Sequence, residues 1–159
     1  MLGYVCKYTP MELFEAMDTE ITRLEPSVTD FNHADTLMHA NICSYTKAVL
    51  EDVMEHDYEG VILTTCCDSI RRLYDTLKSQ FPDKFFFLLD IPRKFNDFAV
   101  ALYERQLKQM LTEYEAFSGK TLDLKRFVSM MQNKAALKKQ ENTRMSASAV
   151  SEKGNGQKL

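Results

Sequence analysis

Four cysteines are the residues of this 159-residue chain best suited to chemistry, and each lies where a predicted strand ends or a predicted helix begins. Cys66 and Cys67 follow the apolar run 61–63, which predicts a strand buried on both faces. Cys6 ends a predicted first strand, and Cys43 lies at or just before the first turn of a helix. Backbone N–H groups and the dipole at a helix start favour a thiolate. The pattern therefore indicates thiolate chemistry at the edge where open α/β sheets bind ligands.

Several interpretations of the cysteines are open from residue types alone. Thiolates hold iron–sulfur clusters because soft sulfur ligands suit iron. Zinc would accept the same thiols with His33 or His39 completing a tetrahedron, but neither histidine has the spacing of a zinc motif. Four small buried residues are the structural alternative, since cysteine is often buried. Glycine-rich phosphate loops and the Gly-x-Ser-x-Gly motif are missing from the sequence.

The remaining sequence predicts the elements that position the thiols. Strands are expected over residues 1–6, 21–24, 61–63 and 85–89, and helices over 11–17, 45–54, 69–80, 97–117 and 121–140. Residues 27–42 have no clean period and predict a loop with up to one turn of helix. Alternating short strands and helices predict one three-layer α/β domain with a short parallel sheet of about four strands.

Charge is distributed unevenly along the chain. Residues 1–119 carry 11 Lys/Arg and 20 Asp/Glu, a balance of −9, whereas residues 120–159 carry 9 and 3, a balance of +6. The basic residues alternate with apolar ones at helical spacing, which favours a solvated helix face over nucleic-acid binding. No apolar stretch is long enough to cross a bilayer, and Lys7 and Glu12 interrupt any signal peptide, so a cytoplasmic protein with reduced thiols is expected.

Four segments together resemble a known family. They are residues 4–13 (YVCKYTPMEL), 39–45 (HANICSY), 65–73 (TCCDSIRRL) and 90–93 (DIPR). In this order they resemble the 2-hydroxyacyl-CoA dehydratase family, which includes dehydratase iron–sulfur components, benzoyl-CoA reductase subunits and double-cubane cluster proteins. The resemblance covers residues 1–145.

The resemblance implies a flavodoxin-like domain that holds a [4Fe-4S] or double-cubane cluster. It also implies an ATP-dependent activator protein that supplies one electron and a CoA-thioester substrate that reacts through a ketyl radical. Carried over by motif, Cys43 and Cys67 become the expected metal ligands, while Cys6 and Cys66 remain possible ligands. The side chains expected next to the cluster are Ser44, Asp68 and Ser69. Cys66 is expected to point away from Cys67, because adjacent residues leaving a strand face opposite sides.

Length is where the chain departs from the family, whose members are well over twice as long. The expected organisation is an α/β cluster-binding domain over residues 1–119, a linker helix over 120–145 that leads toward a missing second domain, and a disordered tail over 146–159. The predicted function is an iron–sulfur component of a 2-hydroxyacyl-CoA dehydratase-like enzyme whose partner is the missing half or a paralogous subunit. The alternative is a non-catalytic fragment or partner-binding subunit with empty thiols.

Overall fold

The computed structural model describes the backbone of residues 1–153 and the side chains of residues 1–140. The chain divides into two units, of which the first is Met1–Leu122 and the second begins at Asp123. The first unit contains strands β1 (Leu2–Tyr4), β2 (Ile21–Arg23), β3 (Gly60–Thr64) and β4 (Phe85–Leu89). Its helices are α1 (Met11–Glu15), α2 (Asn32–Leu37), α3 (Ser44–Glu55), α4 (Asp68–Gln80) and α5 (Asp97–Ser118). Helix α6 (Leu124–Lys153) forms the second unit.

The four strands form one sheet in the order β2-β1-β3-β4, and every neighbouring pair is parallel. All residues of β3 are buried, as its unbroken apolar sequence predicts for a strand covered on both faces. Gly60 at its start is required by packing, because a Cβ there would clash with the backbone carbonyl of Phe85 on β4. The predicted α/β class, with a short parallel sheet in a flavodoxin-like three-layer domain, is confirmed.

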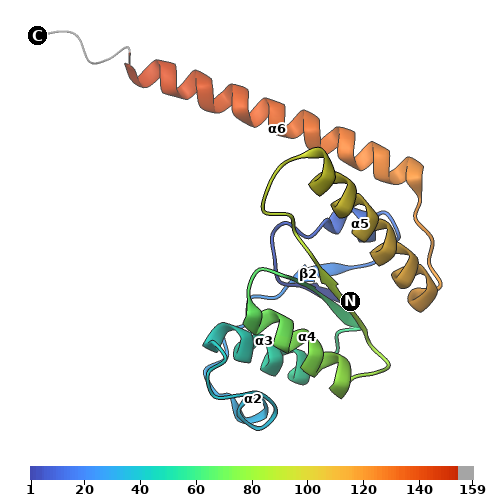
Figure 1. Cartoon of the computed structure of the whole chain (residues 1–159). Coiled ribbons are helices and arrows are strands. Elements are labelled where there is room, and N and C mark those ends of the chain that lie inside the picture. The colour runs from blue at the N-terminus through green and yellow to red at the C-terminus, as the bar shows by residue number, and fades with distance from the viewer. Residues whose placement is uncertain (154–159) are drawn as a thin grey trace, which may run out of the picture. The chain divides into compact units, whose positions relative to one another are not determined.

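Helices cover both faces of the sheet (Figure 1). On one face, α3 and α4 bury their apolar stripes against Val61, Leu63 and Phe86, which alternate with residues pointing the other way. On the opposite face, the ring of Tyr114 from α5 packs edge-on against Phe14 of the α1 segment and Phe85 of β4, at centroid distances of 5.1 and 5.0 Å. The first unit is therefore a helix–sheet–helix sandwich with aromatic packing on one side.

Helix α2 is longer than the sequence predicts. Residues 27–42 were expected to hold up to one turn, whereas α2 spans six residues. The buried carboxylate of Glu51 on α3 explains this helix, since it accepts a hydrogen bond from the backbone N–H of Ala34 at 2.8 Å and lies 2.7 Å from His33 Nδ1. A contact from a distant helix thus stabilises a segment with no amphipathic period of its own.

The boundary between the units lies after Leu122, whereas the sequence predicts it after Gly119. Gly119 does end α5, with φ of 70°. Lys120 still belongs to the first unit, because its ammonium donates to the backbone carbonyl of Asp18 at 2.8 Å. The side chain of Asp123 then accepts from the backbone N–H groups of Lys125 and Arg126, which caps the start of α6.

Helix α6 also extends beyond the predicted linker helix. The structure describes residues 146–153 as helical, whereas the sequence predicts a disordered tail from residue 146. These eight residues include two alanines and no glycine or proline, a composition compatible with a helix. Residues 154–159 of the predicted tail lie outside the described residues. Among the helices that the structure describes, none is both long and apolar enough to span a membrane.

Candidate thiol site at the carboxyl edge of the sheet

The cysteines after β1 and β3 meet at the carboxyl edge of the sheet because these two strands are neighbours. Tyr4 of β1 pairs with Ile62 of β3, so Cys6 and Cys66 both lie just beyond the paired residues. The strand order reverses at this point, since β1 lies between β2 and β3 while the chain runs from β1 to β2 and then back to β3. In doubly wound sheets this switch point is where ligands bind.

Cys43 and Cys67 occupy equivalent positions on two helices. Each is the N-cap residue, Cys43 of α3 and Cys67 of α4, and each has extended backbone angles. Both thiols are exposed. The two helix starts are close enough for the Ser69 side chain, in the first turn of α4, to help lower the pKa of the Cys43 thiol. The start of α4 therefore contributes to the environment of Cys43 on α3.

The environment of Cys43 favours its thiolate form. Partial burial raises the pKa of the Cys43 thiol, but hydrogen bonds from the Thr46 hydroxyl, the Thr46 and Tyr45 backbone and the Ser69 side chain outweigh it, so the pKa is lowered overall. Cys43 Sγ lies 3.1 Å from Thr46 Oγ1. Hydrogen bonds to the charged form are the established cause of such a shift.

Cys6 and Cys66 belong to a separate pocket of about 230 Å³. Its walls include Arg23 from the end of β2, Tyr45 from the first turn of α3 and Thr64 from the end of β3. Burial raises the pKa of the Tyr45 phenol, and the nearby thiols of Cys66 and Cys6 act in the same direction, against Arg23. Cys43 and Cys67 are not among the lining residues, so the four cysteines fall into two groups.

The thiols of Cys43 and Cys67 fit an iron–sulfur cluster in donor type. They are exposed, lie at helix starts and, for Cys43, accept hydrogen bonds that stabilise the thiolate. Among the residues whose side chains the structure describes, no three Cys, His, Asp or Glu side chains gather closely enough to hold a metal ion. This part of the chain therefore has sulfur donors suited to a cluster, but no complete ligand set.

The other predicted residues lie nearby or are engaged elsewhere. Ser44 and Asp68 are exposed at the first positions of α3 and α4, and the carboxylate of Asp68 suits the positive end of a helix dipole. The two histidines weighed as zinc ligands have local partners, since His33 pairs with Glu51 and His39 Nδ1 accepts from the backbone N–H of Asn41. Zinc coordination gains no support from these contacts.

Sequence reasoning missed Thr46 and Arg23. Thr46 is the third residue after the N-cap Cys43, the position whose side chain reaches back in a capping box, so its spacing could have indicated the contact. Arg23 gave no such signal, because only the β2-β1-β3 order brings it beside the cysteines.

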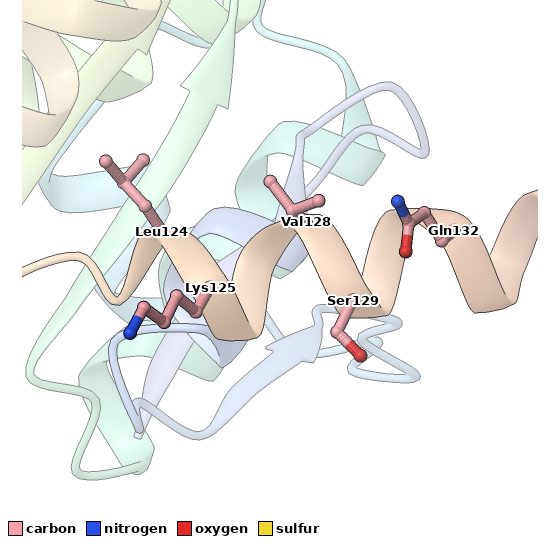
Figure 2. Close-up of a pocket in the computed structure, with 5 residues that line it drawn as sticks. All are labelled: Leu124, Lys125, Val128, Ser129 and Gln132. Atoms are coloured by element: carbon pink, nitrogen blue, oxygen red, sulfur yellow. The ribbon is translucent and has the colours of Figure 1, made fainter.

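Helix α6 carries an apolar surface of its own (Figure 2). Leu124 and Val128 project from the same side of the helix, and their side chains are 65% and 50% exposed. Lys125 and Ser129 lie on an adjacent side of the same depression. One turn further on, Met131 is 44% exposed and continues the apolar stripe.

The fold and the thiols at two helix starts define an α/β domain with a candidate metal-binding edge. The family described as "2-hydroxyglutaryl-CoA dehydratase, D-component" matches residues 6–151. The chain therefore belongs to the 2-hydroxyglutaryl-CoA dehydratase D-component family, in agreement with the resemblance seen in its motifs. A D-component implies a partner subunit in the dehydratase system. Comparison with curated proteins gives no match.

Proposed function

We propose that this chain is an iron–sulfur component of a 2-hydroxyacyl-CoA dehydratase-like enzyme, with Cys43 and Cys67 as metal ligands. The observation that supports this most is the presence of an exposed cysteine at the N-cap of both α3 and α4, with the pKa of the Cys43 thiol lowered by polar groups from both helix starts. Two thiolates on adjacent helix starts form one wall of a cluster site. The membership of the dehydratase family supplies the chemical class.

When bound, a [4Fe-4S] or double-cubane cluster would supply single electrons to a CoA thioester. The residues of this chain would hold and tune it. The Thr46 hydroxyl, 3.1 Å from Cys43 Sγ, would donate to the thiolate, and Ser69 also helps lower the pKa of this thiol. The positive ends of the α3 and α4 helix dipoles act in the same direction.

The remaining ligands would come from elsewhere. The incomplete ligand set among the described side chains fits a cluster shared with a partner subunit, and Cys6 is the in-chain candidate for a third ligand. An ATP-dependent activator protein would deliver the electron. These partners follow from the family and are part of the proposal.

A second function of another class is a partner-binding subunit with empty thiols. The exposed apolar side chains Leu124, Val128 and Met131 on α6 favour it, because such a stripe is suited to contact another chain. The two functions differ in whether iron binds to Cys43 and Cys67.

Anaerobic reconstitution with iron and sulfide tests the proposal, first on this chain and then on its complex with a co-expressed partner component. We expect an oxygen-sensitive brown protein, with sub-stoichiometric iron for the chain alone. Cys43→Ala or Cys67→Ala should abolish the colour. Cys66→Ala is the matched control, because it removes a neighbouring exposed thiol, and it should retain most of the iron.

Iron content and the visible absorption spectrum distinguish the outcomes. A colourless wild-type complex, or a Cys67→Ala variant with wild-type iron content, would contradict the cluster and favour the partner-binding subunit. Loss of colour in Cys6→Ala would assign the third ligand to this chain.

A further inference from the structure

The pocket that contains Cys6 and Cys66 is cationic, although the unit around it is acidic. Arg23 and Lys7 line the pocket, and no Asp or Glu does. Residues 1–119, in contrast, carry a balance of −9. A local cluster of positive charge in a negative domain selects for anionic ligands.

Arg23 is available to a ligand because its ion pair with Glu25 is exposed to solvent and therefore weak. Its guanidinium lies 3.2 Å from Glu25 Oε1, but the two side chains are 49% and 70% exposed. Exposed ion pairs of this kind contribute little free energy, so a carboxylate in the pocket can replace Glu25. The phenol of Tyr45 lines the same pocket and is a further hydrogen-bond donor.

Thr64 provides an independent sign of a ligand. It lines the pocket and is only 1% exposed, yet its hydroxyl has no hydrogen-bond partner within the described part of the chain. Buried hydroxyls are normally paired, so an unpaired one that lines a pocket calls for an explanation such as a ligand. An acceptor bound in the pocket would give this hydroxyl the partner that it does not have within the described part of the chain.

The other walls define the rest of the ligand. Val5 and Ile70 are buried apolar residues that line the pocket. The volume of about 230 Å³ lies below the range of about 300–1,000 Å³ for drug-sized sites. A small molecule with an anionic end and a short hydrocarbon body fits these walls.

We propose that the pocket at the β1–β3 switch point binds a small organic acid. Its carboxylate pairs with Arg23 and accepts hydrogen bonds from Tyr45 and Thr64, while its hydrocarbon body packs against Val5 and Ile70. The carboxylate belongs either to a free acid or to the end of a dicarboxylic acyl group that lies farthest from its thioester bond. This site goes beyond the proposed function, because it requires no cluster and uses neither Cys43 nor Cys67.

Isothermal titration of the full chain at constant ionic strength tests the free-acid form. Sodium butanoate should bind saturably, whereas butanamide, its uncharged isostere, should not. Arg23→Gln should weaken butanoate binding about tenfold or more, because it removes a charged hydrogen-bond donor. Arg72→Gln removes an exposed arginine of α4 that does not line the pocket and should leave binding unchanged. Glu25→Gln should tighten binding, since it removes the competing carboxylate.

Thr64→Val gives a pair of effects that a purely structural role would not produce. The substitution is nearly isosteric and removes the unpaired hydroxyl, so the melting temperature of the free protein should rise. Affinity for butanoate should fall in the same variant, while Thr64→Ser, which keeps the hydroxyl, should retain it.

The thioester source is tested with glutaryl-CoA and butanoyl-CoA, and this arm alone rests on the proposed function. If the carboxylate is that of an acyl group, Arg23→Gln weakens glutaryl-CoA binding and leaves butanoyl-CoA binding unchanged. Binding of butanoate without either thioester would support the pocket and count against the dehydratase function. If Arg23→Gln changes the affinity for neither butanoate nor glutaryl-CoA, the carboxylate site is wrong.

Discussion

The sulfur of Cys43 lies 3.1 Å from the hydroxyl oxygen of Thr46, one turn further along α3. Thr46 is fully buried, so its hydroxyl is held in place by the packing of α3. The contact makes Thr46 a direct determinant of how much thiolate Cys43 carries at neutral pH.

Thr46→Val should therefore slow the alkylation of Cys43. Removing the hydroxyl raises the pKa of the thiol toward its ordinary value, which decreases the thiolate fraction at pH 7 and the rate severalfold. The measurement is the pH dependence of iodoacetamide labelling, followed at Cys43 by peptide mass spectrometry. Thr46→Ser keeps the hydroxyl and should alkylate at close to the wild-type rate; equal rates in the Val variant would contradict the assigned role.

Tyr114→Phe should destabilise the first unit by about 1–2 kcal/mol. The fully buried Tyr114 phenol donates to Glu59 Oε1 at 2.8 Å, and its oxygen lies 3.1 Å from Thr19 Oγ1. The phenylalanine ring keeps the aromatic packing and removes only these bonds. Urea denaturation measures the loss, with Tyr103→Phe as control, because the Tyr103 hydroxyl makes a single exposed contact of 3.4 Å. Equal stability of the two variants would show that the buried bonds contribute nothing.

The same tyrosine makes stability depend on pH in alkaline solution. Burial, together with the hydrogen bond to Glu59, raises the pKa of Tyr114 from its ordinary 10.0 to about 12. The folded state therefore holds this proton more tightly, so its stabilising effect is complete below pH 10 and is lost as pH rises through 12. The expected slope is up to about 1.4 kcal/mol per pH unit for each such proton. Tyr114→Phe should flatten the dependence of unfolding free energy between pH 10 and 12.

Glu51→Leu should loosen α2 from α3 and cost about 1–3 kcal/mol, because it leaves the buried N–H of Ala34 without an acceptor. Hydrogen exchange at the Ala34 amide should accelerate more than exchange within β3. Glu51→Gln retains an acceptor oxygen and should be closer to wild type. Unchanged exchange at Ala34 in the Leu variant would mean that α2 is held by other contacts.

Gly60→Ala should be the most damaging small substitution in the sheet, with a cost of roughly 3 kcal/mol or more, because its methyl group meets the backbone of β4 rather than a movable side chain. Thermal unfolding provides the measurement. Gly119→Ala is the comparison, since its methyl group would meet no neighbour and only the φ of 70° opposes it, at about 1–2 kcal/mol. A Gly60→Ala protein as stable as the Gly119→Ala protein would contradict the close β3–β4 approach.

Local patterns predicted those parts of the fold that depend on local sequence. The runs 61–63 and 85–89 are continuously apolar, which is sufficient to predict buried parallel strands, and Gly119 marked the end of α5. The helix α2 could not be predicted in this way, because it depends on the carboxylate of Glu51 from another helix. Tertiary contacts of this type override weak local preferences.

The same limit applies to the thiol site. The position of each cysteine at a strand end or helix start could be inferred from sequence, since capping and strand termination are local. The grouping of the cysteines in space could not be inferred from sequence. Cys6 and Cys66 share a pocket because β1 pairs with β3, and Ser69 influences the pKa of Cys43 because α3 and α4 pack against each other.

The pairing of β1 with β3 also sets an order of events for the growing chain. Residues 2–4 pair with residues 60–62, so a long loop must close before the carboxyl edge of the sheet exists. Such distant pairings form late and slowly compared with local helices. During synthesis, β1 and Cys6 leave the ribosome well before Cys66 and Cys67 are made. A ligand of this edge, whether cluster or organic acid, can therefore bind only after the first unit has largely been synthesised.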